Sequence, residues 1–262
     1  MHSVVTGHFL DTNIVFDAIY ENRPFYQTFQ KFYSKFLPFN IGVTLPVMQE
    51  VHKIAARSAM LLVEHLHNEI NTNNWDNLTI KDKERLLNSI RDNLAGDQRI
   101  DAVENKKIFV LDAFKAISQQ LISSSKDEII NLLPDLPDDY TKLLQQMIVS
   151  RFVITPVDSD HPLFNDFQTL IKLLNEGSNA FKDGENGDYE IFSNITLLIL
   201  CGAKYSNWNT TSFTDINFYC NDRRFIINIK EINDYIKSKA RKSVDEEKIE
   251  IALSKIKSAK PY

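Results

Sequence analysis

The sequence predicts an α/β protein with a five-stranded, mostly parallel sheet, and three observations lead to this prediction. Short apolar segments that resemble strands alternate with amphipathic segments that resemble helices, which is the pattern of parallel sheets. A long block without strand character, residues 68–150, interrupts this alternation and predicts a helical insertion after the second strand. The chain has 262 residues and seven glycines, which disfavours a turn-rich β-sandwich or a glycine-rich nucleotide loop.

Each expected strand is a short apolar run bounded by a break or a helix. The expected strands lie near residues 4–10, 41–44, 152–157, 216–220 and 225–229. Pro46 suits the first turn of a helix through "VMQEVHKIAARSAMLLVEHLHNEI", and a further helix is expected to end near Gly177. These elements predict a single domain with one sheet.

The insertion is expected to be helical because it has capping signals of its own. Thr79 with Asp82, and Ser125 with Glu128, are spaced as helix N-caps and their third-position partners. We expect the insertion to control substrate access, or to serve as a partner surface or homodimer interface. We expect the domain to have three parts, which are an α/β core (1–67 and 151–236), the helical insertion (68–150) and a charged C-terminal helix or tail (237–262).

The composition is that of an ordinary globular protein and gives no sign of a disulfide-rich or membrane protein. Hydrophobic residues make up 43% and charged residues 25% of the chain, as in ordinary globular proteins, and the net charge is −5. Cys201 and Cys220 form no C-x-x-C pattern, so we interpret them as buried free thiols in a reducing cytoplasm. No apolar run reaches the length of a membrane span, so no membrane association is expected.

Several other patterns have ordinary explanations. The spacing of Phe25, Phe29, Phe32 and Phe36 favours helix packing over a base-stacking platform. A zinc site at His52, His65 and His67 is disfavoured, because the sequence contains no H-E-x-x-H motif. The basic residues of the tail are interpreted as a solvated helix face, with RNA-backbone contact as the alternative; they are Lys237, Lys239, Arg241 and Lys242.

Four acids occupy comparable positions in the predicted fold. Asp11 ends the first strand, Glu50 lies early in the helix after the second strand, Asp188 begins a helix, and Asp222 ends the strand "INFYC". Strand ends and helix starts on one edge of a parallel sheet face the same crevice. Four carboxylates gathered there would repel one another unless cations held them, and Mg²⁺ or Mn²⁺ is the cation that suits oxygen ligands. Two such ions close together would form a phosphodiester-cleaving arrangement.

The segments "FLDTNIVFDAI", "LPVMQEVHKI", "GENGDYEIFSNITLLI" and "FYCNDRRF" resemble the PIN-domain nucleases. The resemblance implies a PIN-like fold with strand order 3-2-1-4-5, and it matches Asp11, Glu50, Asp188 and Asp222 to that family's four metal-binding acids. It also implies metal-dependent cleavage of single-stranded RNA, with a toxin, effector or RNA-processing role. Asn13 matches a polar residue that helps to hold the first acid, and Asn221 occupies a position where the family has Ser, Thr or Asn.

The neighbouring charged residues leave alternatives open. Asp215 could compete with Asp222 as the fourth acid, although a strand leads directly into Asp222. Glu185 and Glu190 flank Asp188, and a solvated-loop role is favoured over a ligand role for both. Asp17 is expected at the surface. Two arginines are candidates for contact with substrate phosphate, namely Arg223 and Arg224.

Two functional classes fit these residues. The first is a Mg²⁺- or Mn²⁺-dependent endoribonuclease that acts on single-stranded RNA, with DNA not excluded. The second is a catalytically weak binding or scaffold protein on the same fold that uses the insertion as its partner surface. The presence of all four acids favours the enzyme, because a scaffold gains nothing from mutually repelling carboxylates.

Overall fold

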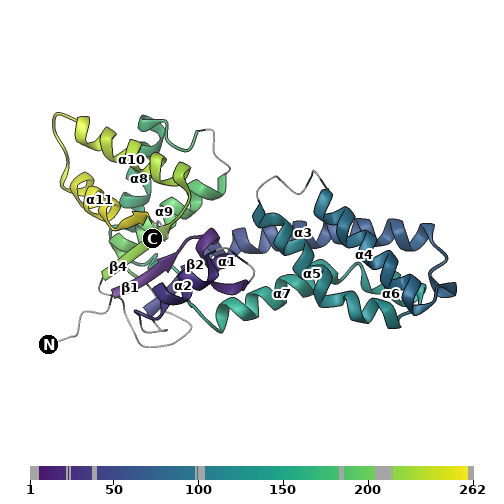
Figure 1. Ribbon diagram of the computed structural model, residues 1–262. Coiled ribbons are helices and arrows are strands. Elements are labelled where there is room, and N and C mark those ends of the chain that lie inside the picture. The colour runs from purple at the N-terminus through teal and green to yellow at the C-terminus, as the bar shows by residue number, and fades with distance from the viewer. Residues whose placement is uncertain are drawn as a thin grey trace. The chain divides into compact units, whose positions relative to one another are not determined.

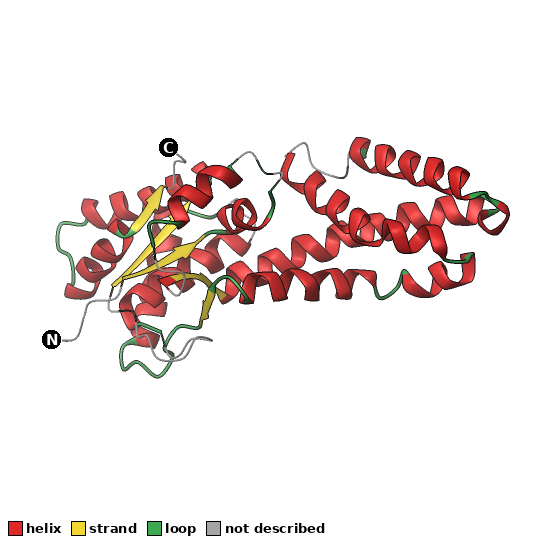
Figure 2. Cartoon of the chain, turned by 60° about the horizontal axis from the view of Figure 1, so that its bottom comes forward, coloured by secondary structure: helices red, strands yellow, loops and turns green. Residues whose placement is uncertain are grey.

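In the computed structural model, the described residues are 6–21, 23, 25–36, 40–97, 99, 104–182, 186–203, 213 and 215–258, with only the backbone described at 104–106, 108 and 186. Five parallel strands form one sheet in the order β3-β2-β1-β4-β5, flanked by helices (Figures 1 and 2). The strands are β1 (Thr6–Leu10), β2 (Ile41–Thr44), β3 (Val153–Thr155), β4 (Asp215–Cys220) and β5 (Ile256–Ser258). The predicted α/β class and strand order are therefore confirmed.

Helices connect the strands, and five of them lie between β2 and β3, as the strand-free block predicts. Those five are α3 (Leu45–Thr72), α4 (Ile80–Gly96), α5 (Glu104–Ser123), α6 (Lys126–Leu132) and α7 (Leu136–Val149), with the short 3₁₀ helix η2 (Trp75–Asn77) after α3. The other described helices are α1 (Thr12–Ile19), α2 (Tyr26–Tyr33), α8 (Phe164–Ser178), α9 (Asn186–Cys201), α10 (Arg223–Ser238) and α11 (Val244–Ser254).

The chain divides into two compact units. We call Met1–Glu50 with Met147–Tyr262 the sheet unit, and Val51–Gln146 the helical unit. The helical unit therefore begins inside α3, earlier than the expected insertion boundary at residue 68. All four acids singled out in the sequence belong to the sheet unit.

Two elements differ from expectation near the C-terminus. The segment 225–229, expected as a strand, lies in α10, because Phe225, Ile229, Ile232 and Ile236 recur at helical spacing and are buried. The fifth strand is instead β5, within the segment 237–262 that was expected to be a charged helix or tail. That segment contains α11 and then β5, which pairs with β4 in parallel.

The core of the sheet unit lies between the sheet and its helices. Helix α9 contacts β2 and β4, as well as α8 and α11, and its side chains Phe192, Ile195 and Leu198 are fully buried. Of the predicted aromatic stripe on α2, Phe29 is buried and Phe32 packs edge-on against Tyr219 of β4. This stripe therefore serves mainly as packing against the sheet.

The helical unit is held together at its tip by contacts between helix ends. Thr79 caps α4, and Ser125 with Glu128 forms a capping box at α6, as predicted. The buried Trp75 indole donates from Nε1 to the Ser124 carbonyl at 3.0 Å, and Lys83 donates to the same carbonyl at 3.2 Å. These bonds satisfy a carbonyl left open at the end of α5.

Candidate functional site

Asp11 follows β1 and precedes α1, at the carboxyl edge of the sheet. Its side chain is 5% exposed and makes no capping hydrogen bond to α1, although its backbone occupies the N-cap position. Burial raises the pKa of Asp11 to about 7; a hydrogen bond from Cys220 lowers it, and the charges of Glu50 and Asp188 raise it further. Asp11 is therefore a buried carboxyl group surrounded by other acids rather than a helix cap.

Glu50 lies in the second turn of α3 and is half-buried. The Thr12 hydroxyl, itself buried in the first turn of α1, donates a short hydrogen bond to Glu50 Oε2. Because Thr12 follows Asp11 directly, this bond ties the start of α3 to the residue beside Asp11. The structure thereby brings Asp11 and Glu50 together.

Asp188 is the third residue of α9 and is half-buried. The first turn of a helix favours negative charge, because its backbone N–H groups point outward. The charge of Asp188 reaches Asp11 and raises its pKa. The carboxyl groups of Glu50 in α3 and Asp188 in α9 therefore both act electrostatically on Asp11, which lies between β1 and α1 at the edge of the sheet.

Asp222 differs from Asp11 because its side chain does cap a helix. Its Oδ1 accepts hydrogen bonds from the backbone N–H groups of Arg224 at 2.6 Å and Phe225 at 3.4 Å, at the start of α10. Its link to Asp11 runs through Cys220, whose thiol is affected by the charges of both acids. The fourth acid thus lies at the same strand edge with one oxygen engaged in capping.

Cys220 is a site residue that the sequence did not reveal. It is the last residue of β4, fully buried, and its Sγ donates to Asp11 Oδ2 at 3.1 Å. In the sequence it was interpreted only as a buried free thiol, and it is indeed free and buried. Its position two residues before Asp222, at the end of a predicted strand, was the signal that could have indicated its contact with Asp11.

The prediction that Asp17 lies at the surface is wrong. Asp17 is 2% exposed, and its carboxylate accepts a hydrogen bond from Arg23 Nε at 2.6 Å. The same guanidinium donates a hydrogen bond from Nη2 to the Asn13 carbonyl at 3.3 Å. Burial raises the pKa of Asp17, and the bond from Arg23 opposes that shift. Asn13 is thus held through its backbone, in the first turn of α1.

The structure also describes the other residues that the sequence suggested near the fourth acid. Asn221 Oδ1 is buried, with no hydrogen-bond partner among the residues that the structure describes. Arg223 and Arg224 are exposed at the start of α10, next to Asp222. Asp215 begins β4, at the opposite end of that strand from Cys220, and pairs with Lys255, so it does not compete with Asp222.

Two further predictions concern the surface. Glu190 is exposed on α9, and Glu185 lies outside the described residues. Three lysines of the basic tail form ion pairs with acids of α11: Lys237 and Lys242 with Glu250, and Lys239 with Glu246. These pairs give most of the basic cluster a role in joining α10 to α11.

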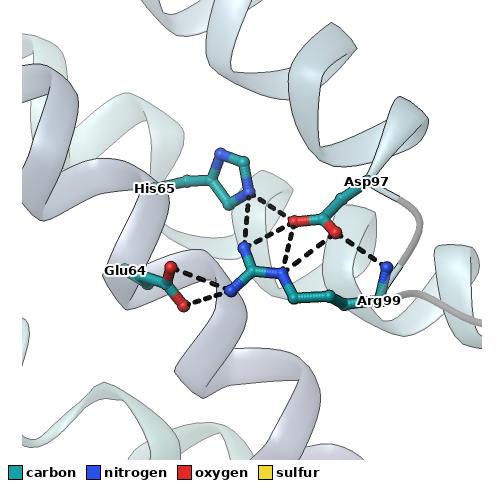
Figure 3. A network of polar contacts seen from close by, with 4 residues as sticks. All are labelled: Glu64, His65, Asp97 and Arg99. Atoms are coloured by element: carbon teal, nitrogen blue, oxygen red, sulfur yellow. Dashed lines mark hydrogen bonds and ion pairs between the residues drawn. The ribbon is translucent and has the colours of Figure 1, made fainter.

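A different polar cluster lies in the helical unit (Figure 3). The Arg99 guanidinium binds Glu64 Oε2 at 2.7 Å and Asp97 Oδ2 at 2.6 Å, and His65 Nε2 lies 2.8 Å from Asp97 Oδ2. The bonds from Arg99 and His65 hold the pKa of Asp97 well below its usual range. Glu64 and Arg99 also line a mainly apolar groove of about 730 Å³ in this unit, beside Met60.

Whether a metal ion fits the acids around Asp11 depends on the chemistry of their oxygen donors and on how their side chains are arranged. Carboxylate oxygens are the donors that Mg²⁺ and Mn²⁺ prefer, and the burial of Asp11 among acids favours a nearby positive charge. As they stand, however, the described residues include no group of three or more His, Cys, Asp or Glu side chains that could hold a metal.

None of the described helices combines the length and apolar character needed to cross a membrane.

Comparison with known proteins adds no identification. No protein-family model, curated protein or solved structure matches the chain, so its functional interpretation depends on the residues and contacts given above.

Proposed function

We propose that the sheet unit is a metal-dependent phosphodiesterase, and specifically an endoribonuclease for single-stranded RNA. The observation that carries this proposal is the buried Asp11 carboxyl group, whose pKa is raised to about 7 by burial and by the charges of Glu50 and Asp188. Buried charges of one sign are costly unless an ion of opposite sign compensates them. Three acids, two of which act electrostatically on the third at the carboxyl edge of a parallel sheet, are an arrangement suited to attracting cations.

Asp11, Glu50, Asp188 and Asp222 would hold Mg²⁺ or Mn²⁺. When bound, the ion supplies an activated water and positive charge for the phosphate oxygens. The chain's own residues orient the donors: Thr12 fixes one oxygen of Glu50, and the α10 amides fix one oxygen of Asp222. The described acids do not close around an ion as they stand, so a bound ion would have to draw their carboxyl groups closer together than they are in the structure.

The arginines at the start of α10 are the proposed phosphate contacts. The backbone N–H groups of Arg224 and Phe225 are already bonded to Asp222, so an incoming phosphate would meet side chains rather than these amides. Arg223 and Arg224 are exposed next to Asp222, which supports their proposed contact with an RNA backbone. A toxin, effector or RNA-processing role would each be compatible with a site that contacts the RNA backbone.

A binding or scaffold protein on the same fold is the second candidate. The observation that favours it is the groove of the helical unit, where Met60 is 62% exposed in a mainly apolar lining. In that case the helical unit would carry the partner or homodimer surface, and the acids of the sheet unit would have no catalytic task.

A cleavage assay separates the two candidates. RNA and DNA oligonucleotides of the same sequence are incubated with the protein in Mg²⁺, in Mn²⁺ or in a chelator. Separate reactions contain wild type, the variant Asp188→Asn or the control variant Asp234→Asn. Asp234 is exposed on α10, so its variant changes a carboxylate away from the site. We expect cation-dependent cleavage of RNA by wild type and by Asp234→Asn, and none by Asp188→Asn. Equal behaviour of all three proteins would reject the enzyme.

A further inference from the structure

Cys220 connects the carboxyl ends of the neighbouring strands β1 and β4 through one sulfur atom. Its Sγ donates to Asp11 Oδ2 at 3.1 Å and accepts from the Asp222 backbone N–H at 3.2 Å. The Asp222 carbonyl oxygen, at 3.9 Å from Sγ, is the more distant acceptor. In the first of these bonds the thiol is the donor and a carboxylate oxygen is the acceptor.

The register of the sheet explains why these groups meet. Leu10 of β1 pairs with Tyr219 of β4, and the Asp11 N–H donates to the Tyr219 carbonyl at 2.9 Å, which extends the ladder by one residue. Asp11 is therefore opposite Cys220, and side chains in register on parallel strands emerge on the same face of the sheet. The thiol is placed against the carboxylate by the fold itself.

We propose that Cys220 is a positioning residue of the acidic site. Its thiol fixes the rotation of the Asp11 carboxylate through Oδ2, and its sulfur holds the Asp222 backbone at the start of α10. One side chain thus sets the orientation of two of the four acids. The proposal builds on the nuclease function proposed above, because orientation matters only if the acids bind a cation.

A packing role is the alternative for a fully buried cysteine. The two roles predict opposite rankings of two substitutions. Cys220→Val keeps an apolar side chain of similar size but removes the donor, whereas Cys220→Ser keeps a donor and loses volume. A packing residue tolerates valine better than serine, and a positioning residue tolerates serine better than valine.

The first test needs neither metal nor substrate. In a Cys201→Ser background only Cys220 contributes to the Raman S–H stretching band, which responds to hydrogen bonding. We expect the band to move to higher frequency in Asp11→Ala, and to move by a smaller amount in Asp11→Asn, which replaces the charged acceptor with a neutral one. Asp234→Ala should leave the band unchanged. A band that is the same in wild type, Asp11→Ala and Asp11→Asn would overturn the proposal.

The second test measures the Mn²⁺ concentration that gives half-maximal cleavage. We expect a rise of roughly 10-fold or more for Cys220→Val and a change of less than about threefold for Cys220→Ser and for the control Cys201→Ser. The reverse ranking of Cys220→Val and Cys220→Ser would assign Cys220 to packing. If wild type cleaves neither RNA nor DNA, the nuclease proposal fails, while the Raman comparison still decides whether the thiol binds Asp11.

Discussion

The two units of the molecule contain carboxylate clusters of opposite character. In the sheet unit, burial and the charges of Glu50 and Asp188 raise the pKa of Asp11. In the helical unit, Arg99 and His65 lower the pKa of Asp97 (Figure 3). A carboxylate bound by a guanidinium already has its counter-charge and serves to hold helices together. A carboxyl group buried against other acids either keeps a proton, as Asp11 does up to about pH 7, or takes its counter-charge from a cation, which is why we place function at Asp11.

The largest effect expected from this difference is on cleavage. Asp11→Asn should lower the rate by at least about 1,000-fold, the scale on which removing one member of a catalytic group acts in other enzymes. Asp97→Asn makes the same chemical change in the helical unit and should leave the rate within about threefold of wild type. The measurement is single-turnover cleavage of an RNA oligonucleotide in Mn²⁺. Comparable losses in both variants would remove the distinction between the clusters.

The second effect is on stability in metal-free buffer. Asp11 titrates near 3.8 when unfolded and near 7 when folded, so between these values the folded state keeps a proton that the unfolded chain loses. Wild-type stability from this group therefore falls as pH rises from about 4 to about 7. Asp11→Asn avoids the loss and should be more stable by about 2 to 4 kcal/mol at pH 8, with little difference at pH 4.

Urea unfolding at the two pH values measures this effect. The control is Asp234→Asn, which should follow wild type throughout. A gain for Asp11→Asn of the same size at pH 4 and pH 8 would show that charge is not its origin.

The orientation of Glu50 gives a smaller effect. Thr12→Val keeps the shape of a buried side chain and removes the hydroxyl that donates to Glu50. We expect the Mn²⁺ concentration for half-maximal cleavage to rise roughly 10-fold, the usual cost of losing a group that orients a metal ligand. Thr79→Val, which alters the α4 cap in the helical unit, is the matched control. An unchanged Mn²⁺ requirement in Thr12→Val would mean that this bond does not orient the site.

The smallest effect is expected from the cluster around Arg99. Because the folded pKa of Asp97 is lowered, its pairing stabilises the protein above the ordinary aspartate pKa and is lost as pH falls below about 4. Asp97→Asn should therefore destabilise the helical unit at pH 7, by no more than about 1 kcal/mol because the cluster is partly exposed, and this effect should be smaller at pH 2, where much of the stabilisation is already lost. Urea unfolding at the two pH values measures this, and a stabilising effect at pH 7 would contradict the comparison.

Local patterns in the sequence predicted much of the fold. β1, β2 and β3 were apolar runs at clear breaks, and the caps at Thr79 and Ser125 follow from side-chain hydrogen bonds within four residues. Helix α10 was misjudged because three isoleucines within the six residues 224–229 suggested a strand and hid a helical repeat that extends to Ile236. β5 is a three-residue edge strand with only Ile256 buried, so it has no alternating pattern to detect.

Site residues could be predicted from the sequence only where an acidic residue stands at the end of a recognisable strand. Asp11 could be singled out from its place at the end of β1, but the contacts that define its environment are not local. Cys220 is 209 residues away from Asp11 in the sequence and meets it through the strand register. The burial of Asp17 likewise depends on Arg23, which lies beyond α1 in the connection to α2. Tertiary pairing of this kind leaves no periodic signal.

The central claim is that the acids around Asp11 form a cation site, and thermal unfolding with increasing Mn²⁺ at pH 8 tests it most directly. A cation that binds only the folded protein raises its melting temperature by mass action. We expect Mn²⁺ to raise the melting temperature of wild type and Asp97→Asn alike, and to have little effect on Asp11→Asn. An equal rise in wild type and Asp11→Asn, or no rise in wild type, would contradict the account.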